Sequence, residues 1–433
     1  MTPAARISAA IEVLTDIEAR RRPANDALKD WGLAHRFAGS GDRAAIAGLV
    51  YDALRRRASS TYVMGEATPR ANMLGMLRLE RDLDVEGIAA LFGDARFAPA
   101  AMSDAERERV VAASLDDAPP HIAGDYPEWL EGSFASVFGE ARGEEGAALA
   151  ARAPLDLRVN TLKAERDVET AELAEYKAEP TGWSPVGLRI IVSPGAKSPA
   201  IQSEPSFIKG GIEIQDEGSQ LAALFSGAKP GEQVVDLCAG AGGKTLALAA
   251  MMENSGQIFA TDTDKRRLSP IHARLERAGV RNVQVRTPRG STEVLEDLKG
   301  SVDLVLIDAP CTGTGSWRRN PDAKWRMRPG ALEIRQKEQT AILDRAVSLL
   351  KPGGRIAYIT CSVLDEENGA QIRAFLARHP AFSVEKPDAA TAALGERSYL
   401  FTKAALISEE GLLMTPRRTG TDGFFVSLLR LNA

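Results

Sequence analysis

The sequence predicts a multidomain protein in which a helical N-terminal part precedes a C-terminal, doubly wound α/β sheet. From Gly210 onward, short apolar runs alternate with helical patterns, which is typical of a parallel sheet covered by helices. The first part instead carries apolar residues at helical spacing, as in residues 7–17 and 46–54. The whole chain has 433 residues, which is enough for two or three domains. We expect an all-α domain at 1–139, a small α+β domain at 140–205 and an α/β domain at 206–433.

The pattern of each part gives the expected elements. The small domain should hold strands at 155–159 and 188–192 around a helix at 165–177. The α/β domain should hold strands at 234–237, 257–261, 283–286, 304–307, 355–360 and 423–429. Its expected helices are 244–252, 265–278 and 331–350.

Composition narrows the class of protein. Hydrophobic residues make up 44% and charged residues 26%, as in globular proteins. Lys and Arg total 54 against 59 Asp and Glu, so the net charge of −5 argues against a histone-like binder but not against local basic patches. No signal-peptide pattern and no apolar run near the roughly 18 residues of a spanning helix occur, so we expect a soluble cytoplasmic protein. Three cysteines form no disulfide framework or Cys-rich zinc site, and no metal is expected.

Residues 236–245, DLCAGAGGKT, join a predicted strand to a predicted helix. Glycines permit a tight turn there, and a helix N-terminus offers free N–H groups to a ligand. A P-loop would need Gly at Cys238, and a dinucleotide fingerprint would need Gly at Thr245. S-adenosylmethionine fits better, because the next strand ends in Asp262, an acid that can bind ribose hydroxyls. A purely structural glycine turn is the alternative.

Two further strand ends carry thiols, in Asp308-Ala309-Pro310-Cys311 and in Ile359-Thr360-Cys361-Ser362. The carboxyl ends of parallel strands are where α/β proteins bind ligands, although a lone strand-end cysteine is usually a small buried hydrophobe. A thiolate that adds to C6 of a pyrimidine makes C5 nucleophilic toward a sulfonium methyl group, and a second group must then help to remove the C5 proton. Asp308 can hydrogen-bond the base. The residues alone leave open which thiol is the nucleophile.

A basic and aromatic segment follows Cys311. We expect its cations to contact RNA phosphates and its tryptophans to be available for base stacking, with core packing favoured for Trp325. The expected phosphate contacts are Arg318, Arg319, Lys324 and Arg326, and Trp317 or Trp325 is available for stacking. The arginine clusters at 20–22 and 55–57 fit RNA contact or solvated helix ends equally well.

Five motifs together resemble, in order, those of the Sun/Nop family of RNA 5-methylcytosine methyltransferases, with the closest likeness to bacterial RsmB-like members. They are DLCAGAGGKT, FATDTDKRRL, LIDAPCTGTGSWRRNPDAKW, YITCSVLDEEN and GTDGFF. The resemblance covers most of residues 205–433. It implies an RRM-like small domain, where Leu157 to Lys163 match, and more weakly a NusB-like, RNA-binding N-terminal domain.

The resemblance also implies roles for single residues. Cys361 of the Thr-Cys motif would be the nucleophile, and Cys311 would assist proton removal and enzyme release. The implied cofactor contacts are Cys238, Ala239, Gly240, Ala241, Gly242, Gly243, Lys244, Asp262 and Asp308. One departure is Thr287-Pro288, where relatives have Gly-Asp and the acid helps to hold the adenosine. The loop also reads Ala239-Gly240-Ala241-Gly242 where relatives often have Ala-Ala-Pro-Gly, a conservative change.

We therefore predict methylation of a cytosine C5 in RNA, with 16S ribosomal RNA as the favoured substrate and S-adenosylmethionine as cofactor. A transfer-RNA cytosine-5 methyltransferase is one alternative. The other is a non-catalytic RNA-binding protein with a degenerate methyltransferase fold, which Thr287-Pro288 would suit. An amino-group methyltransferase is disfavoured, because Cys311 occupies a place where such enzymes tend to have an aromatic residue. The expected partner is RNA, not a membrane, and a monomer is favoured.

Overall fold

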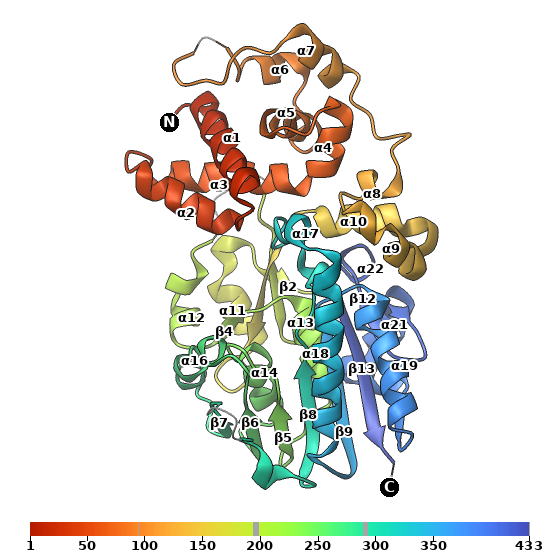
Figure 1. The fold of residues 1–433 in the computed structure, drawn as a ribbon. Coiled ribbons are helices and arrows are strands. Elements are labelled where there is room, and N and C mark those ends of the chain that lie inside the picture. The colour runs from red at the N-terminus through yellow and green to blue at the C-terminus, as the bar shows by residue number, and fades with distance from the viewer. Residues whose placement is uncertain (94, 194–198, 289–292, 433) are drawn as a thin grey trace. The chain divides into compact units, whose positions relative to one another are not determined.

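The computed structural model describes residues 1–93, 95–193, 199–288 and 293–432, and these form two compact units (Figure 1). The helical unit consists mainly of Met1–Ala153 together with Trp317–Met327. The sheet unit consists of Pro154–Ile191, Pro199–Ser316 and Arg328–Ala433. The helical unit thus extends past the expected boundary at 139, and it includes a segment that follows the first thiol motif.

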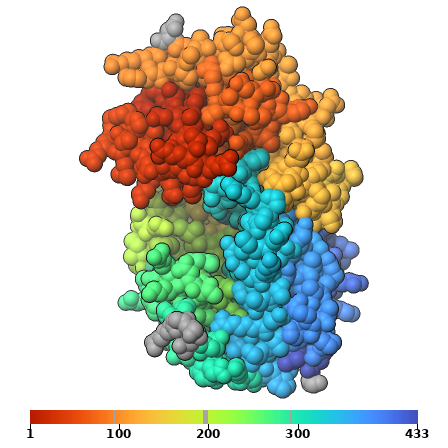
Figure 2. Space-filling view, viewed as in Figure 1, coloured from red at the N-terminus to blue at the C-terminus, as the bar shows by residue number. Residues whose placement is uncertain are grey.

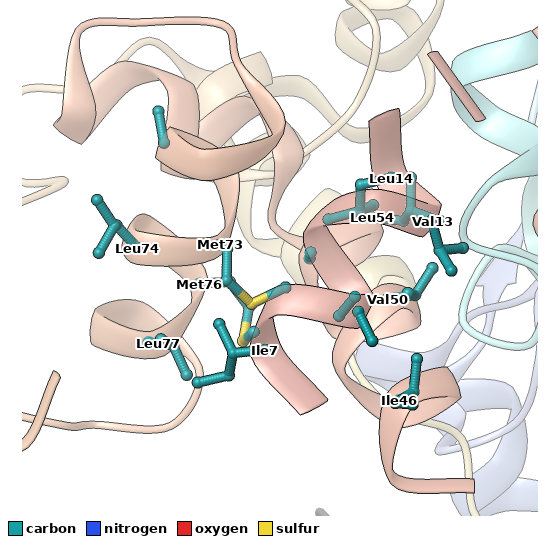
Figure 3. Close-up of a cluster of buried hydrophobic side chains, with 14 of the residues drawn as sticks. Ile7, Val13, Leu14, Ile46, Val50, Leu54, Met73, Leu74, Met76 and Leu77 are labelled. Carbon is teal, nitrogen blue, oxygen red and sulfur yellow. The ribbon is translucent and has the colours of Figure 1, made fainter. Parts of the chain in front are cut away.

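The helical unit is built around its first five helices, α1 (Pro3–Arg20), α2 (Ala24–Ala34), α3 (Ser40–Arg55), α4 (Arg57–Met64) and α5 (Pro69–Leu79). Thr2 caps α1 by accepting a hydrogen bond from the Ala5 backbone N–H, and Pro3 follows as first helical residue. Apolar residues three to four apart on α1, α3 and α5 meet in one core (Figure 3). Smaller helices follow: α6 (Val85–Ala89), α7 (Asp104–Val111), α8 (Pro120–Ala123), α9 (Glu131–Phe138), α10 (Arg142–Ala150) and α17 (Ala323–Arg326).

The sheet unit contains a small antiparallel sheet. In the described residues it has four strands in the order β2 (Glu179–Pro180), β3 (Gly187–Ile190), β1 (Leu155–Val159) and β4 (Ile212–Ile214). Leu157, Leu188 and Ile212 fill its apolar face, which α11 (Arg166–Glu172) also covers. Because β4 pairs with β1, this part runs beyond the expected end at 205.

The large sheet places the candidate site. Over the described residues it holds nine strands, eight of them in the order β11 (Leu406–Ile407), β12 (Leu412–Met414), β13 (Phe424–Leu431), β9 (Leu350–Thr360), β8 (Val302–Asp308), β5 (Gln233–Asp236), β6 (Gln257–Ala260) and β7 (Val283–Val285), with β10 (Phe382–Val384) paired to β13. The strands from β9 to β7 are parallel, as expected. β13 is antiparallel to β9, so the sheet is mixed rather than wholly parallel.

Helices connect the parallel strands. They include α14 (Gly243–Met251), α15 (Lys265–Leu268), α16 (Ile271–Ala278) and α18 (Pro329–Val347), while α13 (Glu217–Phe225) precedes β5 and α19 (Gly369–Arg378) follows β9. The final part of the chain adds α20 (Pro387–Thr391), α21 (Ser398–Ala404) and α22 (Pro416–Thr419). None of the helices in the described part of the chain is both long and apolar enough to span a lipid bilayer.

Strand register brings the motif residues to one edge of the large sheet. Asp308, the last residue of β8, pairs with Ile359 of β9, and Asp236, the last residue of β5, pairs with Leu306 of β8. β5, β8 and β9 are parallel neighbours, so the loops that leave their carboxyl ends start side by side. The cofactor loop and both thiol motifs leave from this edge.

Candidate active site

The two thiols of the sheet unit meet. The Sγ atoms of Cys311 and Cys361 are 3.3 Å apart, within hydrogen-bond distance for sulfur. The backbone N–H of Gly315 donates to the carbonyl of Cys361 at 2.9 Å, which ties the loop after β8 to the loop after β9. The sequence placed both thiols at strand ends, and the structure brings them together.

The Cys311 thiol of this pair is held in its protonated form. Hydrogen bonding to Cys361 raises the pKa of Cys311 well above its ordinary value, and burial and the negative charge of Glu367 raise it further. Cys311 therefore holds its proton and can donate S–H to the neighbouring sulfur. The reactive form of a thiol is the thiolate, so this arrangement suits Cys361 better as nucleophile.

Asp308 lies beside the thiols in an ion pair. Its Oδ2 is 2.7 Å from the Nζ of Lys244, whose side chain is buried, while the side chain of Asp308 is 35% exposed. The Lys244 ammonium is also 5.0 Å from the centroid of the Phe424 ring, a cation–π distance. The ion pair fixes the carboxylate, and its exposed part leaves room for a ligand to hydrogen-bond it.

The cofactor loop has the conformation that its glycines permit. Gly240 and Gly242 have φ of 50° and 87°, a region that side chains rarely adopt. The Gly240 backbone N–H donates to Asp262 Oδ2 at 3.0 Å, so the loop after β5 is joined to the acid after β6. α14 begins at Gly243, directly after the loop. The free N–H groups and the buried acid fit a ligand with a carboxylate and a ribose.

Two other groups brace or line this loop. Arg274 donates to the carbonyl of Ala241 at 2.9 Å and to Glu213 of β4 at 2.9 Å, so the small sheet supports the loop. Burial raises the pKa of the Cys238 thiol, which therefore stays protonated and is not a third nucleophile. Burial also raises the pKa of Asp236 to about 7, against the hydrogen bond that it accepts from Thr245.

Thr287-Pro288, the pair that departs from the family motif, follows the end of β7. No acid stands at Thr287-Pro288. The preceding Arg286 packs its guanidinium over the Phe259 ring at 5.1 Å and pairs with Asp297 at 2.8 Å.

The turn before β13 closes on the loop that carries Cys311. The Gly423 backbone N–H donates to the Gly315 carbonyl at 2.8 Å. A Cβ at Gly315 would lie 2.1 Å from the Gly423 carbonyl oxygen, so no larger residue fits without movement. The turn belongs to the GTDGFF motif of the sequence, and the structure shows that it packs directly against the loop that carries Cys311.

Three side chains around Cys311 escaped the sequence analysis, namely Thr312, Gln339 and Glu367. Glu367 is fully buried and accepts hydrogen bonds from the other two. An acidic turn such as Asp365–Glu367 ordinarily faces solvent. Its place directly after a thiol motif is the signal that could have drawn attention to it.

The structure corrects the expected RNA contact of Lys324. The residue is 1% exposed and lies in the helical unit, where its Nζ donates to the carbonyls of Arg55 at 3.0 Å and Asp125 at 2.6 Å. Burial lowers the pKa of Lys324 to about 7. An ammonium enclosed in this way cannot reach a phosphate. Trp325, whose Nε1 donates to the Leu54 carbonyl at 2.6 Å, packs against the helical core, the role favoured for it.

Arg318 and Trp317 need the same correction. Arg318 is 5% exposed, and its carbonyl accepts a hydrogen bond from Arg55. Trp317 is 1% exposed and stacks on Phe134 at 6.0 Å between centroids, so its ring is not open to a base. Arg319 is half-buried, and the exposed Arg326 pairs with Asp322 at 3.1 Å.

The known proteins that are similar to this chain are methyltransferases, in agreement with the S-adenosylmethionine site expected from the sequence. The family described as 16S rRNA methyltransferase RsmB/F matches residues 224–430. Ribosomal RNA small subunit methyltransferase B of Sodalis glossinidius is 33% identical over 330 residues, which cover 76% of this chain and 68% of the relative. The namesake from Salmonella arizonae is 38% identical over 232 residues, 53% of this chain and 52% of the relative.

Solved structures share the fold. The crystal structure of PH0851 is similar over 99% of each chain, with a TM-score of 0.70 and 25% identity. A methyltransferase homologue from Pyrococcus horikoshii is similar over 72% of this chain and 97% of its own, with a TM-score of 0.58 and 27% identity. The chain spans 66% and 52% of the lengths of two curated relatives. It belongs to the RsmB/F family of 16S rRNA methyltransferases, whose cofactor is S-adenosyl-L-methionine.

Proposed function

We propose that this chain methylates C5 of a cytosine in RNA, with 16S ribosomal RNA as its substrate, through a covalent bond between Cys361 and the base. The observation that carries the proposal is the pair of thiols 3.3 Å apart, at the sheet edge that also holds the Lys244–Asp308 ion pair. Two thiols serve a reaction that first forms and later breaks a carbon–sulfur bond. The relatives named as ribosomal RNA small subunit methyltransferases support the substrate.

Each residue has a defined part in this reaction. The Cys361 thiolate adds to C6, which makes C5 electron-rich. S-adenosylmethionine, which the loop after β5 and Asp262 would hold, would supply the methyl group that C5 takes up. Once its sulfur is bonded to C6, Cys361 no longer provides the thiolate hydrogen bond that is the main cause of the raised pKa of Cys311. Cys311 can then release its proton to solvent, and its thiolate takes the proton from C5. The electron pair of the C5–H bond forms the C5–C6 double bond, the C6–sulfur bond breaks, and Cys361 leaves as a thiolate. Asp308, held by Lys244, hydrogen-bonds the base edge throughout and stabilises the ring that C6 addition requires.

The target base must be unpaired or flipped out, because C5 and C6 are approached from the face of the ring. We assign RNA binding to the helical unit as a NusB-like domain, and we regard the small sheet as RRM-like. Of the four cations expected to meet RNA, the half-buried Arg319 and the exposed Arg326 remain candidates for phosphate contacts.

The cofactor site predicts the effect of Asp262→Ala. Asp262 is 2% exposed and accepts from Gly240, so its loss removes both the ribose partner and a loop support. We expect the Kd for S-adenosylmethionine to rise on the order of 10-fold to 100-fold, from the loss of a charged hydrogen bond. Calorimetric titration measures this. Asp264→Ala, which alters an acid two residues away that caps α15, is the control and should bind nearly as wild type does.

Bisulfite sequencing tests the function. RNA from a deletion strain should lose methylation at one cytosine of 16S rRNA, and the purified protein should restore it in vitro. Loss at a transfer-RNA position instead would make the chain a transfer-RNA enzyme. No lost position in either RNA would overturn the proposal.

A non-catalytic RNA-binding protein is the second candidate, and Thr287-Pro288 is the observation in its favour. Calorimetric titration with S-adenosylmethionine distinguishes the two functions. A catalytic protein binds S-adenosylmethionine at micromolar to low millimolar concentration, whereas a degenerate fold shows no heat of binding in that range.

A further inference from the structure

Glu367 is a buried carboxylate next to the thiol pair that the proposed reaction does not yet use. It is fully buried in the turn Asp365–Glu367 that follows the Cys361 loop. Its Oε1 accepts from the Thr312 backbone N–H at 2.8 Å and from Gln339 Nε2 at 3.0 Å. Its Oε2 accepts from the Thr312 hydroxyl at 2.5 Å. Within the described chain, no lysine or arginine lies at ion-pair distance from it.

This network forms hydrogen bonds to the backbone on both sides of Cys311. Thr312, the next residue, is bound twice by Glu367. Pro310, the preceding residue, has its carbonyl bound by the same Gln339 amide, at 2.9 Å. Gln339 belongs to α18, which forms part of the surface of the sheet unit (light blue in Figure 2) but turns this residue inward. Three elements, η7 (Asp365–Glu367), α18 and the loop after β8, therefore fix one thiol.

The charge of Glu367 also acts on the site. It is one of the causes of the raised pKa of Cys311 and of the raised pKa of Tyr358, in both cases after burial or hydrogen bonding. Tyr358 is itself buried and donates to the Glu367 backbone carbonyl at 2.7 Å. Buried carboxylates are costly, so one without a cationic partner beside a reactive thiol calls for a role beyond packing.

We propose that Glu367 is a positioning residue that, through Thr312 and Gln339, holds the Cys311 thiol beside Cys361 and so controls release of the enzyme from its methylated product. This inference rests on the proposed function. If Cys311 shifts by even about 1 Å, its assistance to proton removal falls steeply, on the order of 100-fold for a misplaced group. The carbon–sulfur bond to Cys361 then persists, and the protein–RNA adduct accumulates.

Two substitutions at Glu367 distinguish the effect of its hydrogen bonds from the effect of its negative charge. Glu367→Gln keeps the hydrogen-bond pattern, because the amide oxygen can accept both N–H groups while its NH₂ donates to the Thr312 hydroxyl. We expect it to turn over without excess adduct but with a pH–rate profile moved to lower pH, since loss of the charge lowers the Cys311 pKa. Glu367→Ala removes the network. We expect at least about a tenfold rise in trapped adduct on denaturing gels and a similar loss of kcat.

Substitutions at Thr312 test the same role if Glu367→Ala fails to fold. Thr312→Val removes the hydroxyl that Glu367 binds, whereas Thr312→Ser retains it, so adduct should accumulate in the first and not in the second. Glu338→Ala is the matched control, because it removes a partly exposed carboxylate of α18 that pairs with Arg335 and is one residue from Gln339. Unfolding curves and S-adenosylmethionine titrations accompany every variant.

The outcomes are distinct. Wild-type turnover without adduct in folded Glu367→Ala and in Thr312→Val would overturn the positioning role. If Glu367→Ala does not fold, the Thr312 pair decides alone. Absence of methylation by the wild-type protein, or absence of adduct in Cys311→Ala, would instead overturn the proposed function and leave a different signature from either result at Glu367.

Discussion

Cys361→Ala should abolish both methyl transfer and the covalent RNA adduct. The raised pKa of Cys311 keeps the proton on that thiol, so we assign the attack on C6 to its neighbour Cys361. Removal of the nucleophile of a covalent enzyme costs on the order of 10³-fold or more in rate. The measurement is transfer of a labelled methyl group to RNA, with denaturing electrophoresis to detect adduct and titration to confirm that the cofactor still binds.

Cys311→Ala should have the opposite effect on the adduct. The C6–sulfur bond still forms because Cys361 is intact, but product release slows, so a protein–RNA band should build up while turnover falls. Cys238→Ala is the control thiol, since its protonated side chain lies in the cofactor loop and should affect cofactor affinity rather than the adduct. Adduct in Cys361→Ala and none in Cys311→Ala would reverse the two roles.

Lys324→Ala is expected to destabilise the helical unit strongly. The substitution deletes a fully buried side chain, and it leaves the carbonyls of Arg55 and Asp125 without the donor that they share. Together the cavity and the unsatisfied acceptors should cost about 3 kcal/mol or more of unfolding free energy. Urea unfolding monitored by tryptophan fluorescence reports it, because Trp325 adjoins the site.

The matched control for Lys324→Ala is Arg326→Ala, on the same short helix. Arg326 is exposed, and its pair with Asp322 should contribute no more than about 1 kcal/mol. A phosphate-binding lysine would show the reverse pattern, with Lys324→Ala lowering RNA affinity at unchanged stability. That result would restore the sequence-based interpretation of this residue.

Lys324 also predicts a pH dependence. Its pKa is about 7 in the folded protein against an ordinary value of 10.5, so between these pH values the unfolded chain binds more protons. Stability then rises with pH across this window, by up to about 1.4 kcal/mol per unit. The difference in unfolding free energy between wild type and Lys324→Met should therefore increase from pH 7 to pH 9. A constant difference would mean that Lys324 titrates at its ordinary pKa.

Local sequence patterns predicted the longer strands correctly. The strand expected at 155–159 is β1, and that expected at 257–261 ends one residue earlier as β6. Both are short apolar runs whose burial follows from period and propensity. The strands β10, β11 and β12 escaped, because runs of two or three residues carry too little pattern to separate them from loops. The antiparallel entry of β13 depends on how the chain returns to β9, which no local pattern encodes.

The residues of the candidate site could be predicted where a single sequence motif contains the reactive side chain. Asp308 ends β8, Cys311 and Cys361 follow the ends of β8 and β9, and parallel pairing of these strands brings the three residues together. The prediction for the basic segment after Cys311 was wrong for Lys324, because charge in a sequence suggests solvent or phosphate. Lys324 instead donates to two backbone carbonyls that are distant in the sequence, at the end of α3 and in the turn after α8. Glu367 was missed for the same reason. Burial of a charged group is a tertiary property.

The position of Trp317–Met327 has a practical consequence for dividing the gene. This stretch completes the helical unit, yet it is encoded more than 160 residues after that unit's main segment ends at Ala153. An expression fragment that stops near residue 153 would lack Lys324 and Trp325, and its core would open where they pack. A fragment that starts there would carry the same two side chains without their partners. RNA-binding studies of the helical unit alone therefore require a permuted or fused chain that restores residues 317–327.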